Sequence, residues 1–332
     1  MKRPLFVFAG QSNMMGASVF QASEQIFYKN SFEYLHKPRR FGDVIGEFKN
    51  YGFPVGEFSY KDLVTAYGEN SNSNSISTLD NYLSNTFFCP SMCNLKDREE
   101  KTIYPFSFFS EANNRKAVSL APYIVKGLED KGFACTYTHI AKGGVPIKYY
   151  LEDNAANYFY TKVADFFAEC QKRFQNDDMN EKALVWLQGE SDANHGFEYY
   201  LDALKTFWKR AKEAGFTKFL IVRVGYFGNT KISDIMRAQE EFCKNSDDSF
   251  IITRVCSFLK WQGNEPEGWF DGELSDEFTF CRDSFYGFAN QHINEKGFKV
   301  IAKYAVPNII RILFENKIPL LEEEKVSALL HM

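Results

Sequence analysis

The stretch Phe6-Val7-Phe8-Ala9-Gly10-Gln11-Ser12-Asn13-Met14-Met15-Gly16 contains the pattern that decides the fold. Its apolar first half is typical of a buried β-strand, which we expect over residues 4–9. A glycine follows at once, so the strand is predicted to run into a tight turn that carries Ser12. In open α/β sheets, ligands bind at the carboxyl ends of the strands. The pattern therefore places a serine hydroxyl where a nucleophile could act.

Short apolar runs rich in β-branched or aromatic residues recur along the chain, at 134–141, 183–188, 218–224 and 250–255. Helical patterns alternate with them, at 117–131, 158–174, 197–214, 232–243 and 294–314. This alternation predicts an α/β fold, a three-layer αβα sandwich around a mostly parallel five-stranded sheet.

Residues 17–110 interrupt the alternation between the first strand and its crossover helix. Ordinary connections of this kind have about 2–6 residues. We predict one domain over 1–332, with 17–110 as an insertion and 318–332 as a C-terminal tail. The insertion is either a peripheral decoration or a wall that shapes the site beside Ser12. A second loop-like stretch, 260–290, precedes the last helix.

Composition excludes several classes of function. The chain has 39 basic and 43 acidic residues, a net charge of −4, so it offers no basic field for nucleic acid. No run approaches the about 18 apolar residues of a membrane span, and the N-terminal run is too short for a signal peptide. Seven cysteines without a Cys-x-x-Cys pair predict free thiols in a reducing compartment, so a cytoplasmic location is expected. No cluster has metal-ligand spacing, and no cofactor is predicted.

A serine nucleophile needs a general base, and the chain has five histidines. His139 lies within a predicted strand, His36 lies in a basic part of the insertion, and His331 is the penultimate residue. His195 and His292 remain, each in a loop beside a core element. His292 has the better context, because the last helix is predicted to begin directly after it.

Hydrogen-bond donors for a developing oxyanion are also present. Gly143 and Gly144 follow the second strand, where a missing side chain lets a backbone N–H face a ligand. Gln188-Gly189-Glu190-Ser191-Asp192 follows the third strand and offers the amide of Gln188. Its two carboxylates could instead form an acid/base pair, but residues two apart rarely flank a sugar from both sides.

Four blocks in this order resemble the SGNH-hydrolase superfamily: Gly10-Gln11-Ser12-Asn13-Met14, Gly143-Gly144, Gln188-Gly189-Glu190-Ser191-Asp192 and His292. The resemblance is closest to the carbohydrate-esterase branch, with its sialate O-acetylesterase-like and acetylxylan-esterase-like proteins. It covers roughly residues 1–16 and 117–314. It implies a flavodoxin-like fold, Ser12 as nucleophile and His292 as base.

The resemblance also implies an oxyanion hole made of the Ser12 N–H, the Gly143 or Gly144 backbone and the Gln188 side chain. The residues that it implies in supporting roles are Gln11, Asn13 and Glu190.

One position departs from the superfamily pattern, which usually has an aspartate three residues before the histidine. Here that residue is Ala289. A backbone carbonyl or Asn290 could orient His292 in a Ser-His dyad. A carboxylate from elsewhere could do so instead, and those considered are Asp283, Asp271 and Glu190. Alternatively, the site is impaired, although loss of the orienting group does not abolish acyl transfer.

The activity that the resemblance implies is that of a serine esterase. It would remove O-acetyl groups from a carbohydrate such as sialic acid, xylan or another polysaccharide, without a cofactor. Two alternatives stay open, namely a catalytically impaired glycan-binding protein and a polysaccharide O-acetyltransferase on the same scaffold.

Overall fold

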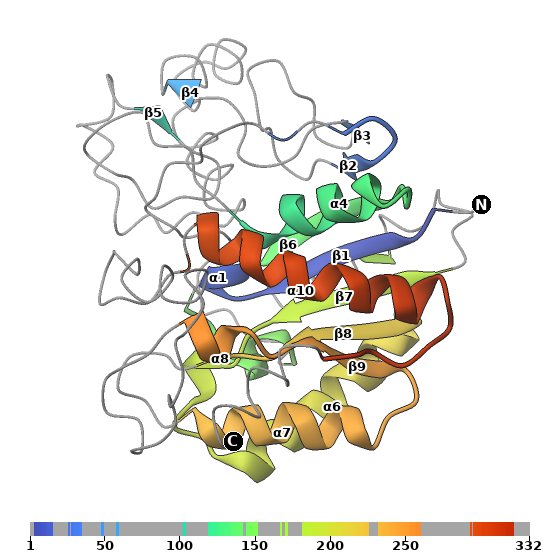
Figure 1. Cartoon of the computed structure of the whole chain (residues 1–332). Coiled ribbons are helices and arrows are strands. Elements are labelled where there is room, and N and C mark those ends of the chain that lie inside the picture. The colour runs from blue at the N-terminus through green and yellow to red at the C-terminus, as the bar shows by residue number, and fades with distance from the viewer. Residues whose placement is uncertain are drawn as a thin grey trace, which may run out of the picture.

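The computed structural model describes residues 3–15, 26, 28–34, 48–49, 58–59, 102–103, 119–141, 144–151, 167, 170–171, 181–225, 232–259, 293 and 295–321. Within these ranges the main element is a seven-stranded sheet with the strand order β3-β2-β6-β1-β7-β8-β9 (Figure 1). Its strands are β1 (Leu5–Gly10), β2 (Phe32–Tyr34), β3 (Phe48–Lys49), β6 (Thr136–Ala141), β7 (Lys182–Leu187), β8 (Lys218–Val222) and β9 (Ser249–Thr253).

The five predicted strands correspond to β1, β6, β7, β8 and β9, which pair in parallel. The predicted strand number was too small, because the sheet also contains β2, parallel to β6, and β3, antiparallel to β2. Both come from the predicted insertion, and three or two residues are too few to leave a periodic pattern. Two further short strands, β4 (Phe58–Ser59) and β5 (Thr102–Ile103), form a separate antiparallel pair.

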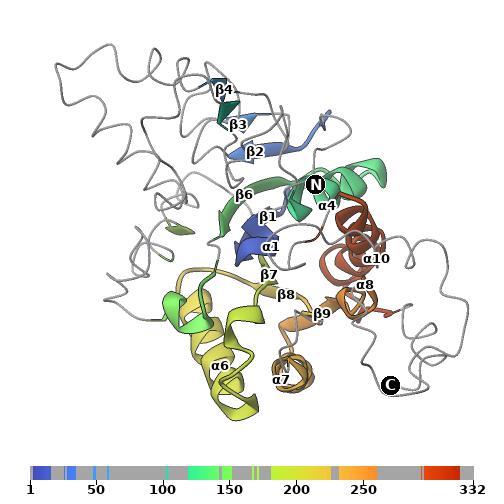
Figure 2. The same cartoon turned by 90° about the vertical axis from the view of Figure 1, so that its left-hand side faces the viewer.

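Helices cover both faces of the sheet, which confirms the three-layer sandwich (Figure 2). On one face, α4 (Leu120–Asp130) packs against α10 (Glu295–Leu313). On the other, α6 (Phe197–Glu213) packs against α7 (Ser233–Lys244). The predicted helix at 158–174 lies outside the described residues except for three positions. The short helices are α1 (Ser12–Met15), η3 (Ile147–Tyr150), η4 (Glu190–Asp192) and α8 (Cys256–Leu259).

The core lies between these layers and explains the apolar strand sequences. Every residue of β1 is buried, as expected for a strand covered by helices on both sides. Between the sheet and α6, three aromatic rings pack against one another: Trp186 of β7, Phe207 of α6 and Phe219 of β8. Within the described ranges, no helix combines the length and the apolar character needed to cross a bilayer.

The strand order also fixes where a ligand can bind. After β1 the chain forms β2, β3 and β6 on one side of β1, and it then crosses to form β7 on the other side. Doubly wound sheets bind ligands outside the carboxyl ends of the strands at such a reversal. The carboxyl end of β1 is followed directly by α1, whose first residue is Ser12.

Candidate active site

The turn that presents Ser12 depends on Gly10. Its φ is +145°, and a Cβ atom at this position would lie 2.0 Å from the Leu187 carbonyl oxygen of β7. Only glycine therefore lets the ends of β1 and β7 approach so closely, and the Gln11 N–H then donates to the Leu187 carbonyl at 3.1 Å. Ser12 is 6% exposed. Among the described residues its Oγ has no hydrogen-bond partner, so the hydroxyl is available to a ligand or a base.

Asn13 connects three elements at this edge of the sheet. Its Nδ2 donates to Glu190 Oε1 at 2.8 Å, which ties the end of β1 to η4 after β7. Its Oδ1 accepts a hydrogen bond from the backbone N–H of Ile293 at 3.0 Å, just before α10. Both bonds are buried, so the residue next to Ser12 holds the approach to the last helix against the turn.

Glu190 is a buried carboxylic acid, and only one of its two carboxyl oxygens has a hydrogen-bond partner among the described residues. Apart from the Asn13 bond to Oε1, its Oε2 is buried and has no hydrogen-bond partner among the described residues. Burial raises the pKa of the Glu190 carboxyl, because desolvation opposes its charge more than the Asn13 hydrogen bond favours it. The neutral acid is therefore favoured over a wider pH range than for an exposed glutamate.

Gln188 is completely buried at the end of β7. Its Nε2 faces three acceptors: Gln11 Oε1 at 3.3 Å, Val145 O at 3.2 Å and Asp192 Oδ2 at 2.5 Å. The Tyr200 hydroxyl donates to Gln188 Oε1 at 2.9 Å, which fixes the orientation of the amide. An amide nitrogen has two N–H donors, so both are already used in this arrangement.

Within the described ranges, Gln11 has a side-chain amide nitrogen that is open to a ligand, whereas that of Gln188 is occupied. Its Oε1 accepts hydrogen bonds from Gln188 Nε2 and from the Ser191 backbone N–H at 3.2 Å. These bonds fix the side-chain amide beside Ser12, while its Nε2 has no hydrogen-bond partner in the described part of the chain. The side-chain donor that is open to a ligand next to Ser12 therefore belongs to Gln11.

The loop after β6 is anchored at the same place. Gly144 is exposed with a φ of +69°, and its N–H has no hydrogen-bond partner within the described ranges. Further along, the Ile147 N–H donates to Asp192 Oδ2 at 2.8 Å. The Tyr150 hydroxyl donates to the Gly10 carbonyl at 2.6 Å. These two contacts hold the Gly144 loop against the Ser12 turn, as an oxyanion hole would need.

Several predicted site residues are not placed by the structure. Gly143, Asp271, Asp283, Ala289, Asn290 and His292 lie outside the described residues, so the assignment of the base stays a prediction. His139 lies in β6 opposite Phe8, in the strand position that was predicted. His195 is exposed after η4, with its ring 4.6 Å from that of Tyr199. Within the described ranges, no three metal-ligating side chains cluster.

Three supporting residues were not predicted from the sequence: Asp192, Tyr200 and Gln239. Gln239 Nε2 donates to the Gln188 carbonyl at 2.9 Å, and its Oε1 accepts from the Val224 N–H at 3.0 Å. A signal was present, because Gln239 is a polar residue on the apolar face of α7. Asp192 ends η4, four residues after Gln188, and the turn between β7 and η4 brings its Oδ2 to Gln188 Nε2.

Comparison with known protein families finds no match, and comparison with curated proteins finds none either. Among solved structures, a protein from Arabidopsis thaliana is similar at 11% identity and a TM-score of 0.45, over 92% of this chain and 97% of that one. NanS is similar at 12% identity and a TM-score of 0.45, over 95% of this chain and 98% of that one.

A carbohydrate acetylesterase from Xanthomonas citri is similar at 12% identity and a TM-score of 0.43. The match covers 94% of this chain but 57% of that one. Identities and TM-scores this low are insufficient to assign an activity or a site residue to this chain.

Proposed function

We propose that the chain is a serine esterase that removes O-acetyl groups from a carbohydrate through an acyl-enzyme on Ser12. One observation carries the proposal. The Asn13 side chain bonds both Glu190 and Ile293, so the sequence blocks around Ser12 and Gln188 and the start of the last helix meet at one sheet edge. The reversal of strand order at β1 adds the topology that such a site requires.

His292 is the proposed base. It immediately precedes Ile293, whose N–H is bonded to the residue after Ser12. This closeness along the chain to a residue that contacts the Ser12 turn supports the choice of His292 over the other histidines. The orienting group for its ring is proposed to be a main-chain carbonyl or Asn290 in a dyad. The alternative is an acid displaced from the usual position, namely Asp283, Asp271 or Glu190.

The reaction follows from these roles. Ser12 Oγ attacks the acetyl carbonyl carbon while His292 takes the hydroxyl proton. The tetrahedral intermediate collapses, the sugar oxygen leaves with the proton from His292, and the acetyl group stays on Ser12. A water molecule, deprotonated by His292, attacks the acetyl-serine, and acetate leaves as Ser12 recovers its proton.

The oxyanion of the intermediate needs converging donors. The Ser12 N–H lies at the first position of α1, where no intrahelical partner exists, and the Gly144 N–H is open. The third donor is proposed to be a side-chain amide, for which Gln188 is implied by the resemblance. The geometry favours Gln11, because its Nε2 is open whereas that of Gln188 is occupied.

Alanine variants distinguish the two glutamines. Gln11→Ala should lower kcat by about 10²–10³, the usual cost of one lost oxyanion donor. It should also lower stability, because Gln188 Nε2 and the Ser191 N–H lose an acceptor. Gln188→Ala should lower the free energy of unfolding, because Asp192 Oδ2 and the Tyr200 hydroxyl each lose a buried hydrogen bond to the Gln188 side chain. If Gln188→Ala lowers kcat without loss of stability, and Gln11→Ala does not, the assignment is reversed.

Hydrolysis of an aryl acetate and of O-acetylated sugars tests the proposal. The wild type should release acetate and Ser12→Ala should not, with Ser191→Ala as the matched control. Equal turnover by wild type and Ser12→Ala would rule out the esterase. Glycan binding without acetate release from any ester would favour the impaired binding protein. This alternative is considered because Ala289 stands where the superfamily usually has the orienting aspartate. Acetyl transfer that depends on an added acceptor sugar would favour the acetyltransferase.

A further inference from the structure

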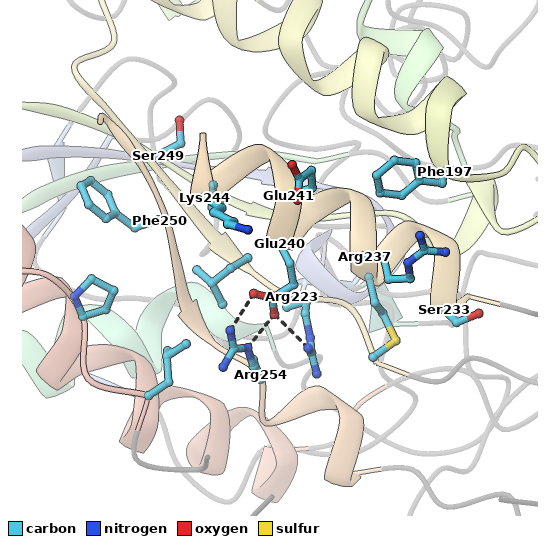
Figure 3. Close-up of a pocket in the computed structure, with 15 residues that line it drawn as sticks. Phe197, Arg223, Ser233, Arg237, Glu240, Glu241, Lys244, Ser249, Phe250 and Arg254 are labelled. Atoms are coloured by element: carbon cyan, nitrogen blue, oxygen red, sulfur yellow. Dashed lines mark hydrogen bonds and ion pairs between the residues drawn. The ribbon is translucent and has the colours of Figure 1, made fainter. Parts of the chain in front are cut away.

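A groove of about 890 Å³ lies between α7 and the edge strand β9, and no residue of the Ser12 turn lines it (Figure 3). Its third wall is the segment that follows α10. We call it the α7–β9 groove. Much of its lining is apolar, with contributions from Phe197, Met236, Phe250, Ile251 and Leu321. An apolar groove of this size on a surface is typical of a binding site for a peptide or another ligand.

The groove also carries an excess of positive charge. Four basic side chains line it against two acidic ones, and the basic residues are Arg223, Arg237, Lys244 and Arg254. One of the acids, Glu240, accepts two hydrogen bonds of 2.6 Å from Arg254 and one of 2.8 Å from Arg223 (Figure 3). Arg237 pairs with Asp234 at 3.2 Å, whereas Lys244 has no ion-pair partner among the described residues. The groove therefore suits an acidic and partly apolar occupant.

The chain itself leads into this groove. After α10 it turns back, and the Leu320 N–H donates to Asn308 Oδ1 at 2.7 Å. Asn308 Nδ2 in turn donates to the Ile252 carbonyl of β9 at 3.0 Å. These bonds fix the segment beside β9, so that Leu321 forms part of the groove wall. Ile318 and Leu320 are 72% and 53% exposed, which leaves apolar surface uncovered next to the groove.

Residues 322–332, which follow Leu321, are acidic and apolar and so complement the basic and apolar lining of the groove. The sequence Glu322-Glu323-Glu324-Lys325-Val326-Ser327-Ala328-Leu329-Leu330-His331-Met332 lies outside the described residues. Three acids open it, and the apolar Val326, Leu329 and Leu330 follow at the spacing of one helix face. Eleven residues as a helix span about 16 Å, close to the about 18 Å of the twelve-residue α7.

We propose that residues 322–332 dock in the α7–β9 groove of their own chain. Glu322 lies on the same helix face as Val326, Leu329 and Leu330, so it faces the basic side chains of the groove while this stripe covers its apolar lining. Because the segment begins at the groove wall, its effective concentration is in the millimolar range without any association cost. A separate partner would have to pay that cost in lost translational freedom. The inference is independent of the proposed esterase activity.

Hydrogen exchange measured by mass spectrometry on the full chain tests this. Amides in 322–332 should exchange at least about tenfold more slowly than an unstructured peptide of the same sequence. Leu329→Asp places a charge on the docking face and should return these amides to the unstructured rate. Ala328→Asp is the matched control, because residue 328 lies on the opposite face of the same helix, and it should keep the protection.

A groove-side variant locates the docking site. Lys244→Glu should reduce the protection of 322–332, and Lys209→Glu, an exposed residue of α6 outside the groove, should not. Unstructured rates in the wild type would overturn the proposal, as would equal effects of Leu329→Asp and Ala328→Asp. Protection that is lost on dilution would also overturn it, because it would show that a second copy and not the same chain fills the groove.

Discussion

At the scale of single residues, the Asn13 side chain links the Ser12 turn to two other parts of the chain by hydrogen bonds. Both ends of its amide are engaged, one by Glu190 and one by the Ile293 backbone. Asparagine suits this position because one side chain supplies a donor and an acceptor. The motif around Ser12 can therefore be understood as a structural joint as well as a carrier of the nucleophile.

Glu190 gives a prediction about pH at this scale. Its pKa is raised in the folded chain, so the stability that it contributes is complete below the ordinary glutamate pKa of 4.5 and is lost as the pH rises toward the folded value. Glu190→Gln keeps the shape and the acceptor for Asn13 but cannot ionise. The melting temperature of Glu190→Gln relative to wild type should therefore rise as the pH is raised above the ordinary glutamate pKa of 4.5.

Thermal unfolding at several pH values measures this trend. Glu198→Gln, an exposed residue in the first turn of α6, is the control and should show no such rise. A constant or falling difference for Glu190→Gln would show that the buried acid is not held neutral.

At the scale of elements, Glu240 fastens α7 to the ends of β8 and β9. Arg223 follows β8, Arg254 follows β9, and both guanidinium groups bond this one carboxylate. Hydrogen bonds from Arg254 and the charges of both arginines lower the pKa of Glu240 although burial opposes the shift. The stabilisation is present above the ordinary glutamate pKa and is lost as the pH falls through the lowered one.

Glu240→Gln should lower the free energy of unfolding by about 1–3 kcal/mol at neutral pH, a range reduced for its partial exposure. The loss relative to wild type should shrink as the pH is lowered, because the wild-type carboxyl then becomes neutral as well. Urea denaturation at neutral and acidic pH measures both effects. Glu241→Gln, next on α7, is the matched control and should change stability by less than about 0.5 kcal/mol. An equal loss at both pH values would contradict the ionic origin.

Elements with long periodic patterns were predictable, and short ones were not. The patterns at 197–214 and 232–243 match α6 and α7 to within a residue, because each buries a continuous apolar stripe. By contrast, β2 has three residues and pairs with the edge of β6, and β3 has two residues and pairs with β2. Their strand form is set by pairing partners far away in the sequence, which no local pattern reveals.

At the scale of the whole molecule, the strand order explains why separate motifs meet. The ends of β1, β6 and β7 are neighbours, so Ser12, Gly144 and Gln188 were predictable as one region from the alternation of strands and helices. The roles of the glutamines within it were not. Which amide is open depends on Tyr200 and Asp192, contacts that exist only in the folded network.

The most direct test of the central claim is to look for the acetyl group on Ser12. An aryl acetate has a good leaving group, so acylation of Ser12 should be fast relative to deacylation, and a rapid acid quench of the wild type during turnover should trap the intermediate. Peptide mass spectrometry should then find one acetyl group on Ser12 and none in Ser12→Ala treated identically. Acetate release with no acetylated Ser12 in any quenched sample, and with undiminished turnover by Ser12→Ala, would contradict the account.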